Sequence, residues 1–147
     1  KMYYRIWINY KKLTQAKNST VKNTLDRVFS QWIRRKAADE NGWATCFTCG
    51  RPKPWFQLQN GHYVRRDDMC TRYHPENNHP QCENCNIFLR GNLKVYAQKL
   101  DERYGEGTSE KLEALGKQTC KIHRNEMIEL IRKLDKEIGE MIDGKRS

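Results

Sequence analysis

Apolar residues recur at steps of three and four in two long stretches of the chain, a spacing typical of the buried face of an α-helix. The first stretch follows Ser19 and Thr20, either of which can cap a helix, and ends near Asn41-Gly42. The last stretch begins near His123. We expect the two apolar faces to pack against each other, with a dimer seam as the alternative for the last helix. The apolar positions are Val21, Leu25, Val28, Phe29, Trp32, Ile33 and Ala37 in the first stretch, and Met127, Leu130, Ile131, Leu134, Ile138 and Met141 in the last.

Between these helices the pattern predicts shorter elements. Residues 43–50 fit a strand, a tight turn and a second strand, residues 51–55 a proline-stiffened loop, and residues 56–64 one strand of a hairpin. A helix is expected to open at Asn86, and Thr108 then caps a shorter helix. The first of these two helices has its apolar stripe at Leu89, Leu93, Tyr96, Ala97, Leu100 and Tyr104.

The start of the chain gives weaker signals. Apolar and polar residues alternate over residues 2–10, which fits a strand or a short aromatic helix, and the polar residues after them suggest a linker. We therefore separate residues 1–18, an N-terminal segment of uncertain structure, from a single domain over residues 19–147. Within that domain we expect a core over residues 43–104 and C-terminal helices over residues 108–143.

The charge balance of the chain favours a polyanionic partner. The 147 residues include 28 Lys and Arg against 18 Asp and Glu, which gives a formal net charge of +10 and a pI near 9.4. Nucleic acid is the first candidate for such a basic protein. No apolar run approaches the roughly 20 residues that a membrane-spanning helix needs, and the first residues do not resemble a signal peptide. We therefore expect a cytoplasmic protein. Its core should be thin, since the mean hydropathy is −1.00.

Four of the six cysteines form two CxxC pairs, Cys46 with Cys49 and Cys82 with Cys85. Each pair places two sulfur atoms on one tight turn, and a tetrahedral ion can then join the two turns. This spacing predicts a structural zinc site with reduced thiolates, in preference to two disulfides. Cys70 and Cys120 have no such neighbours, and we expect them to be free thiols.

The residues between the CxxC pairs suit phosphodiester cleavage. That reaction needs a base to activate water, a divalent cation to hold the scissile phosphate, and basic residues to grip the backbone. His62 on a hairpin strand, opposite a helix that begins with Asn86, can supply the base and a cation ligand. The alternative roles are a buried histidine beside the zinc and a helix N-cap. The candidate phosphate contacts beside this cleft are Arg65, Arg66, Arg72, Arg90 and Lys94.

The order of these residues resembles the treble-clef form of the HNH, or ββα-metal, endonuclease family. That form begins with a CxxC knuckle, which is followed by a hairpin His and a mid-loop Asn. It ends with a second CxxC that is followed by Asn or His. The resemblance implies an α+β fold in which a short hairpin and a helix surround structural Zn²⁺ and further helices enclose this core. It also implies that His62 is the general base, that Asn77 ties the loop over the hairpin, and that Asn86 is a ligand of a catalytic Mg²⁺ or Mn²⁺.

A closer resemblance, from about Thr20 onward, is to the phage NinG, or Rap, recombination nuclease family. It rests on segments such as Phe29-Ser-Gln-Trp-Ile-Arg, Thr45-Cys-Phe-Thr-Cys-Gly and Asn77-Asn-His-Pro-Gln-Cys. The resemblance implies a metal-dependent DNA endonuclease that acts on branched recombination intermediates, Holliday junctions and D-loops, in a bacterial cell carrying a phage or prophage. Phage or host recombination proteins would be further partners, and a homodimer would suit the cutting of two strands. A non-catalytic, zinc-dependent DNA-binding accessory protein is the alternative function.

One position departs from the HNH pattern. Many members have an Asp directly before the hairpin His as a second metal ligand, whereas this chain has Gly61. The missing ligand would have to come from elsewhere in the chain. The candidates are Asp67, Asp68, His74 and His79. Trp43 and Trp55 could stack on DNA bases at a branch point, but packing within the protein is the preferred interpretation.

Overall fold

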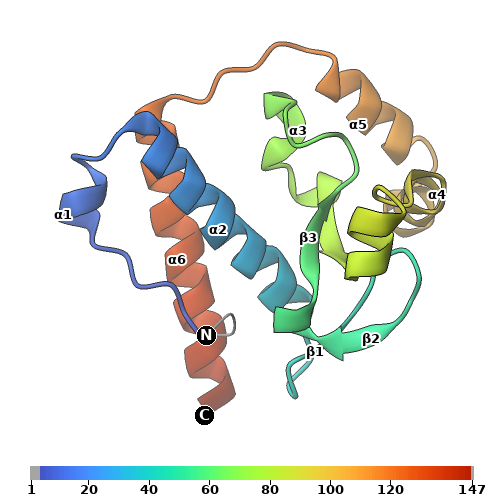
Figure 1. The fold of residues 1–147 in the computed structure, drawn as a ribbon, viewed down its shortest axis with the longest axis horizontal. Helices are drawn as coiled ribbons and strands as arrows, with labels where there is room; N and C mark the ends of the chain where they lie inside the picture. The colour runs from blue at the N-terminus through green and yellow to red at the C-terminus, as the bar shows by residue number, and fades with distance from the viewer. Residues whose placement is uncertain (1–3, 147) are drawn as a thin grey trace.

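Two long helices form one side of the molecule, and two small hairpins with short helices form the other (Figure 1). The computed structural model describes residues 4–146. Helix α2 (Asn18–Ala37) packs along helix α6 (Arg124–Arg146), and the two share the largest apolar cluster, which confirms the predicted pairing of their faces. None of the helices in residues 4–146 has the length and apolar character that crossing a bilayer requires.

Helix α2 begins and ends differently from the prediction. It starts at Asn18 after an extended Lys17, and no side chain caps it. Ser19 and Thr20 lie inside the first turn, so the predicted cap is wrong. The helix stops at Ala37, because Ala38 is already extended, and Gly42 belongs to the following turn, where its φ is 82°.

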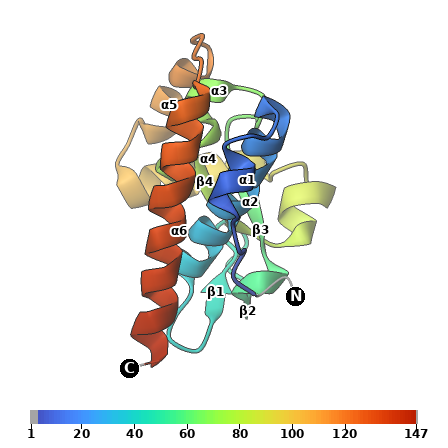
Figure 2. The same cartoon turned by 90° about the vertical axis from the view of Figure 1, so that its left-hand side faces the viewer.

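The N-terminal segment lies against both long helices without forming a strand (Figure 2). From residue 4 to residue 9 it has no regular structure, and helix α1 (Tyr10–Leu13) follows, capped by the Asn9 side chain. The Arg5 guanidinium lies 3.2 Å from Asp135 of α6, and the Tyr10 hydroxyl donates to the same carboxylate at 2.7 Å. The alternation predicted a strand or an aromatic helix here, and over the described residues neither forms because apolar side chains pack on the α2–α6 cluster instead. Residues 1–3 lie outside the described part.

Two antiparallel hairpins carry the middle of the chain. Strand β1 (Trp43–Thr45) pairs with β2 (Pro52–Pro54), and strand β3 (Gln59–His62) pairs with β4 (Asn78–Gln81), with His62 opposite Asn78. The predicted loop over residues 51–55 is therefore partly strand. The single turns η1 (Trp55–Gln57), α3 (Met69–Arg72) and η2 (Pro75–Asn77) connect these strands.

The helix predicted to open at Asn86 is broken in two. A turn of π-helix, η3 (Asn84–Phe88), is followed by a bend and then by α4 (Leu93–Tyr104) and α5 (Thr108–Gly116). The bend has positive φ values at Arg90, Gly91 and Asn92, which turn the chain out of the helix. As a result Leu89 and Leu93 are exposed, contrary to the predicted stripe, whereas Tyr96 and Leu100 are buried as expected.

Cys70 and Cys120 form a disulfide, so the expectation of free thiols is wrong. The bond joins α3 to the segment after α5 and closes a separation of 50 residues in sequence. Packing between α3 and α5 brings the two cysteines together. Sequence spacing could not indicate this, because disulfide connectivity has no local signature.

Candidate functional site

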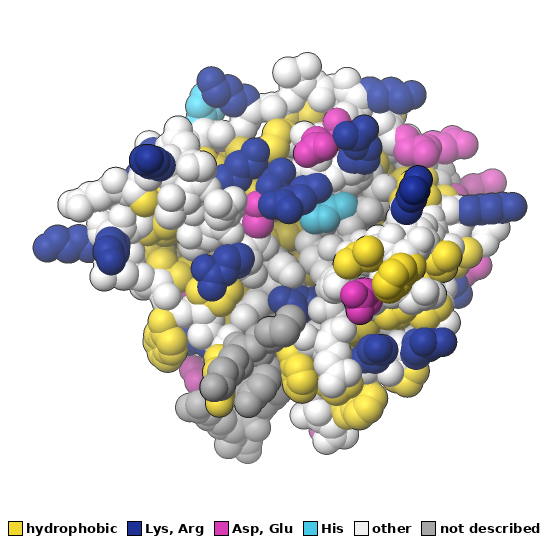
Figure 3. All heavy atoms as spheres, viewed as in Figure 1, with side chains coloured by type: hydrophobic (Ala, Val, Ile, Leu, Met, Phe, Trp, Pro, Cys, Tyr) yellow, Lys and Arg dark blue, Asp and Glu magenta, His cyan; other side chains and the backbone are white. Residues whose placement is uncertain are grey.

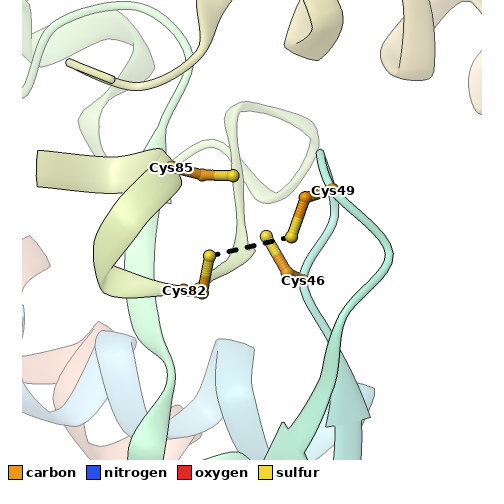
Figure 4. Close-up of side chains that lie close together, drawn as sticks. All are labelled: Cys46, Cys49, Cys82 and Cys85. Atoms are coloured by element: carbon orange, nitrogen blue, oxygen red, sulfur yellow. Dashed lines mark hydrogen bonds between the residues drawn. The ribbon is translucent and has the colours of Figure 1, made fainter. Parts of the chain in front are cut away.

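The four paired cysteines meet at one point. Cys46 and Cys49 lie in the turn after β1, and Cys82 and Cys85 lie where β4 leads into η3 (Figure 4). Their sulfur atoms all lie within 4.8 Å of one another, and those of Cys49 and Cys82 are 3.7 Å apart. Tetrahedral zinc with bonds of about 2.3 Å requires sulfur atoms about 3.8 Å apart. The predicted convergence is confirmed, and the cluster could hold an ion such as Zn²⁺.

Local hydrogen bonds prepare the cluster for a cation. Burial raises the pKa of Cys46, but hydrogen bonds from the Cys49 backbone and the Thr48 hydroxyl outweigh burial and lower the pKa to about 6. Burial and the neighbouring thiols raise the pKa of Cys49 to about 12. One thiolate therefore forms readily and opposes the ionisation of the next, so that a bound cation is needed to hold all four as thiolates.

A large open groove lies beside the hairpin of β3 and β4. Its walls come from the N-terminal segment, α2, the loop after β3, and η3, and its volume is about 1520 Å³. Sites for small molecules are typically about 300–1,000 Å³, so this groove suits a more extended ligand. Figure 3 shows basic side chains gathered around a histidine on this face. The polar residues of the wall that matter below are Asn60, His62, Arg65, Arg66, Asn86 and Arg90.

His62 ends strand β3 and faces the groove. Burial lowers the pKa of its imidazole to about 4, helped by the positive charges of Arg72 and Arg66, while a hydrogen bond to the Arg72 backbone acts in the opposite direction. The ring is therefore neutral near pH 7. A neutral imidazole with one nitrogen engaged by the backbone keeps the other nitrogen as a proton acceptor.

The loop behind His62 is held by Asp26 of α2, which sequence reasoning did not single out. Asp26 accepts hydrogen bonds from Arg72 at 3.0 and 2.5 Å, from the Tyr73 hydroxyl at 2.7 Å and from Arg66 at 2.9 Å. Burial raises the pKa of Asp26, but the hydrogen bonds from Arg72 and Tyr73 outweigh it and hold that pKa below its ordinary value. A helix-face aspartate has no pattern that would have marked this role.

Arg72 is a structural residue and not an open phosphate contact. Its side chain is 7% exposed, its Nε and Nη2 donate to Asp26, and its Nη1 donates to the Arg66 carbonyl at 3.0 Å. The sequence predicted a phosphate contact here because a buried arginine cannot be distinguished from an exposed one by its position in a loop. Lys94 is exposed on α4 and is not part of the groove wall.

Asn77 is fully buried and bridges the two ends of the loop. Its Oδ1 accepts from the Val64 amide at 2.8 Å, and its Nδ2 donates to the carbonyls of Val64 and Thr71 at 3.1 and 3.2 Å. The side chain thus fixes the loop that carries Arg65 and Arg66 beside the groove.

Two asparagine residues of the groove wall each have a side-chain oxygen without a protein partner among the described residues. Asn86 donates its Nδ2 to Gln59 at 2.8 Å, which leaves its Oδ1 unpaired. The Oδ1 of Asn60 is buried without a hydrogen bond, while its Nδ2 donates to Asn78 at 3.1 Å. Asn78 uses its own Nδ2 on the carbonyls of Arg72 and His74, and this fixes the orientation of both amides.

Asn60 was missed by the sequence analysis, although a signal existed. Residues two apart on a strand share a face, so Asn60 lies on the His62 side of β3. Gly61, between them, faces the buried side chain of Gln81, and a Cβ at position 61 would collide with that amide. Gln81 is itself fixed by hydrogen bonds to Thr48 and Gly91, so an aspartate does not fit at position 61 without rearrangement.

The other candidates for a second metal ligand are mostly engaged elsewhere. Both ring nitrogens of His79 are hydrogen-bonded, to Tyr96 at 3.0 Å and Tyr104 at 2.7 Å, and burial lowers its pKa to about 3. The Nδ1 of His74 accepts from the Glu76 amide at 3.1 Å. Asp68 precedes α3, and only Asp67 of the four lies on the groove wall, paired with Arg65 at 3.1 Å.

Together, the fold and the site define an α+β protein in which a four-cysteine cluster that could hold a metal ion lies beside a basic groove. A protein-family model described as Bacteriophage Lambda NinG protein matches residues 4–142, and the chain therefore belongs to the NinG family. This confirms the resemblance to the NinG family. Comparisons with curated proteins and with solved structures each gave no match.

Proposed function

We propose that this NinG-family protein is a metal-dependent DNA endonuclease of the HNH type. The observation that carries the proposal is the groove itself, in which a neutral His62, free amide oxygens and exposed arginines share one wall. A base, hard oxygen donors and phosphate-binding cations are the three components that phosphodiester hydrolysis requires.

His62 acts as the general base in this proposal. Its free ring nitrogen accepts a proton from a water molecule in the groove, while the Arg72 backbone holds the ring in place. Arg65, Arg66 and Arg90 bind the phosphates on either side of the bond that is cut.

The unpaired oxygens of Asn60 and Asn86 suit Mg²⁺ or Mn²⁺, because these hard cations prefer oxygen ligands and usually share them with a substrate phosphate. Such an ion, when bound, would neutralise charge on the phosphate and stabilise the leaving oxygen. Asn60 thereby replaces the aspartate that the HNH pattern has at position 61, since Gln81 fills the space that an aspartate needs.

Zinc at the cysteine cluster is structural in this proposal. Cys85 directly precedes Asn86, so an ion that joins the two cysteine turns also fixes the start of η3 on the groove wall. The substrate that we propose, branched recombination DNA such as Holliday junctions and D-loops, rests on the resemblance to phage recombination nucleases. The work of the protein would then lie inside the phage-carrying bacterial cell, beside other recombination proteins.

Cleavage of a labelled four-way junction and of a linear duplex of the same sequence tests the function. Wild type and His62→Ala are compared with Mg²⁺, with Mn²⁺ and with no added divalent ion, and zinc content is measured throughout. We expect cutting by wild type only, with added metal only, and with preference for the junction. Removal of a general base typically costs about 10²- to 10⁴-fold in rate.

A DNA-binding accessory protein without catalysis is the second candidate function. The observation that favours it is the fixed Gln81 amide, which leaves no room for the usual aspartate before His62. If the wild-type protein bound the four-way DNA junction tightly but did not cut it in Mg²⁺ or Mn²⁺, the result would favour this candidate.

A further inference from the structure

The groove is flanked by hydrophobic side chains that the fold leaves in solvent. The two most exposed large hydrophobic residues of the described chain are Trp7, at 84%, and Phe88, at 72%. Trp7 lies on the groove wall, and so does Ile87, the neighbour of Phe88. Figure 3 shows hydrophobic side chains collected next to the histidine of this face. Large hydrophobic side chains that are exposed together beside a groove, in contrast to single ones scattered over the surface, are typical of a binding site.

The exposed turn over residues 87–89 is held firmly by its own backbone. The Leu89 amide donates to the Asn84 carbonyl at 2.8 Å, the Arg90 amide to Ile87 at 3.1 Å, and the Gly91 amide to Cys85 at 2.9 Å. Cys85 belongs to the four-cysteine cluster, so the turn begins at a buried residue of that cluster. Ile87, Phe88 and Leu89 are therefore presented outward by a rigid base and are not exposed by a loose loop.

The charges around this turn favour nucleic acid as its occupant. Arg90 follows the turn directly and Lys94 lies after the bend, in the first turn of α4, while Arg65 and Arg66 lie on the groove wall. An apolar turn flanked by cationic side chains matches a nucleobase flanked by the phosphates of its strand. A second copy of the chain would bring like charges together around the same patch, which disfavours self-association there.

We propose that the turn over residues 87–89 is a base-contacting wedge, with Phe88 stacked on an unpaired or unstacked nucleobase and Trp7 on a second base across the groove. The substrate class is DNA that contains unpaired bases. The inference rests on the proposed function for the location of the DNA, but it concerns binding and not cleavage. Apolar side chains inserted at base steps, and aromatic rings stacked on single-stranded bases, are established modes of such contacts.

The test measures binding of fluorescently labelled DNA in the presence of Ca²⁺. A duplex with a three-base bulge is compared with the fully paired duplex of the same sequence, for wild type, Phe88→Ala, Phe88→Tyr and Trp7→Ala. Trp43→Ala is the matched control, because Trp43 is 48% exposed but is not on the groove wall. One lost stacking contact corresponds to about a 5- to 150-fold loss of affinity.

We expect Phe88→Ala to lose affinity for the bulged duplex by that factor and to bind the paired duplex as wild type does. Trp7→Ala should show a smaller loss of the same kind, while Phe88→Tyr and Trp43→Ala should match wild type. Equal losses on both duplexes, no loss on either, or a change in sedimentation mass in Phe88→Ala would overturn the proposal. Because His62→Ala should show the same binding contrast, a failure of cleavage alone would affect only the proposed function.

Discussion

The cysteine cluster and the groove meet at η3, which carries Cys85 and Asn86, yet the two sites differ in how completely the chain encloses them. The cluster takes four identical ligands from two short sequence motifs, and three of the four are buried. The groove takes its polar groups from a strand, a loop and a π-turn, and it stays open on one side. A closed set of four ligands is typical of a structural ion, and an open set leaves room for substrate. In the proposed function the first site therefore supports the fold, and the second binds the substrate.

The largest effect is expected when the cluster is broken. Cys82→Ser should abolish stoichiometric zinc binding and unfold the two hairpins, because structural zinc contributes on the order of 10 kcal/mol of apparent binding free energy in small metal domains. Helices α2 and α6 should keep part of their circular dichroism signal, since their shared core contains none of the four cysteines. Metal analysis and thermal unfolding measure this. Cys70→Ser, outside the cluster, should keep its zinc, and a metal-bound Cys82→Ser protein would refute the four-cysteine site.

A smaller but substantial loss of stability is expected when Asp26, which holds the loop beside the groove, is replaced. Asp26→Ala leaves the buried Arg72 guanidinium without its partner, and loss of one member of such a pair costs about 3 kcal/mol. Asp67→Ala removes an exposed ion pair and should cost no more than about 1 kcal/mol. Urea unfolding of the two variants measures the contrast.

The pH dependence of stability also distinguishes Asp26→Ala from Asp67→Ala. The folded state holds the pKa of Asp26 below its ordinary value, so its stabilisation is complete above the unfolded pKa of about 3.9 and is lost as the pH falls through the folded pKa. Asp26→Ala should lack this part of the acid-induced loss. Equal destabilisation of the two variants would show that Asp26 does not hold the loop.

The two sites also differ in how far sequence could predict them. Cys46, Cys49, Cys82 and Cys85 were found because zinc requires local pairs of ligands at a fixed spacing. The pairing of α2 with α6 was found because apolar periodicity is a local property. Asp26 and the Cys70–Cys120 disulfide were missed, since each depends on contacts between residues at least 40 positions apart.

The break after η3 was missed for a different reason. The periodicity runs through Leu89 and Leu93 as though one helix continued, but the bend at Arg90, Gly91 and Asn92 exposes both leucines. Gly91 is compatible with a turn, and its carbonyl accepts from the buried Gln81 at 2.9 Å, a tertiary contact that no helical pattern encodes. The prediction was wrong at the exposed turn for which we propose base contacts. Side chains buried there could not contact DNA.

The groove and the cluster are also expected to bind different metal ions, so variants in the groove should change Mn²⁺ binding without changing zinc content. Asn60→Ala and Asn86→Ala should each raise the Mn²⁺ concentration needed for half-maximal binding in the presence of non-cleavable junction DNA, by about 10- to 100-fold. Zinc content should stay at the wild-type level in both. Calorimetric titration of Mn²⁺ measures the shift. Asn41→Ala, in an exposed turn away from the groove wall, is the control, and an unchanged Mn²⁺ affinity in Asn60→Ala would remove Asn60 from the ligand set.

The smallest effect is expected from single arginines on the groove wall. Arg65→Ala and Arg90→Ala should each weaken binding to all DNA sequences alike and reduce the slope of log affinity against log salt concentration by about one, since each removes one phosphate contact. Lys133→Ala, on α6 and outside the groove wall, should leave the slope unchanged. The slope is the informative quantity because it counts phosphate contacts separately from base contacts. Phe88→Ala should therefore lower affinity for bulged DNA at constant slope, and if Arg90→Ala also left the slope constant, the DNA path along the groove would be wrong.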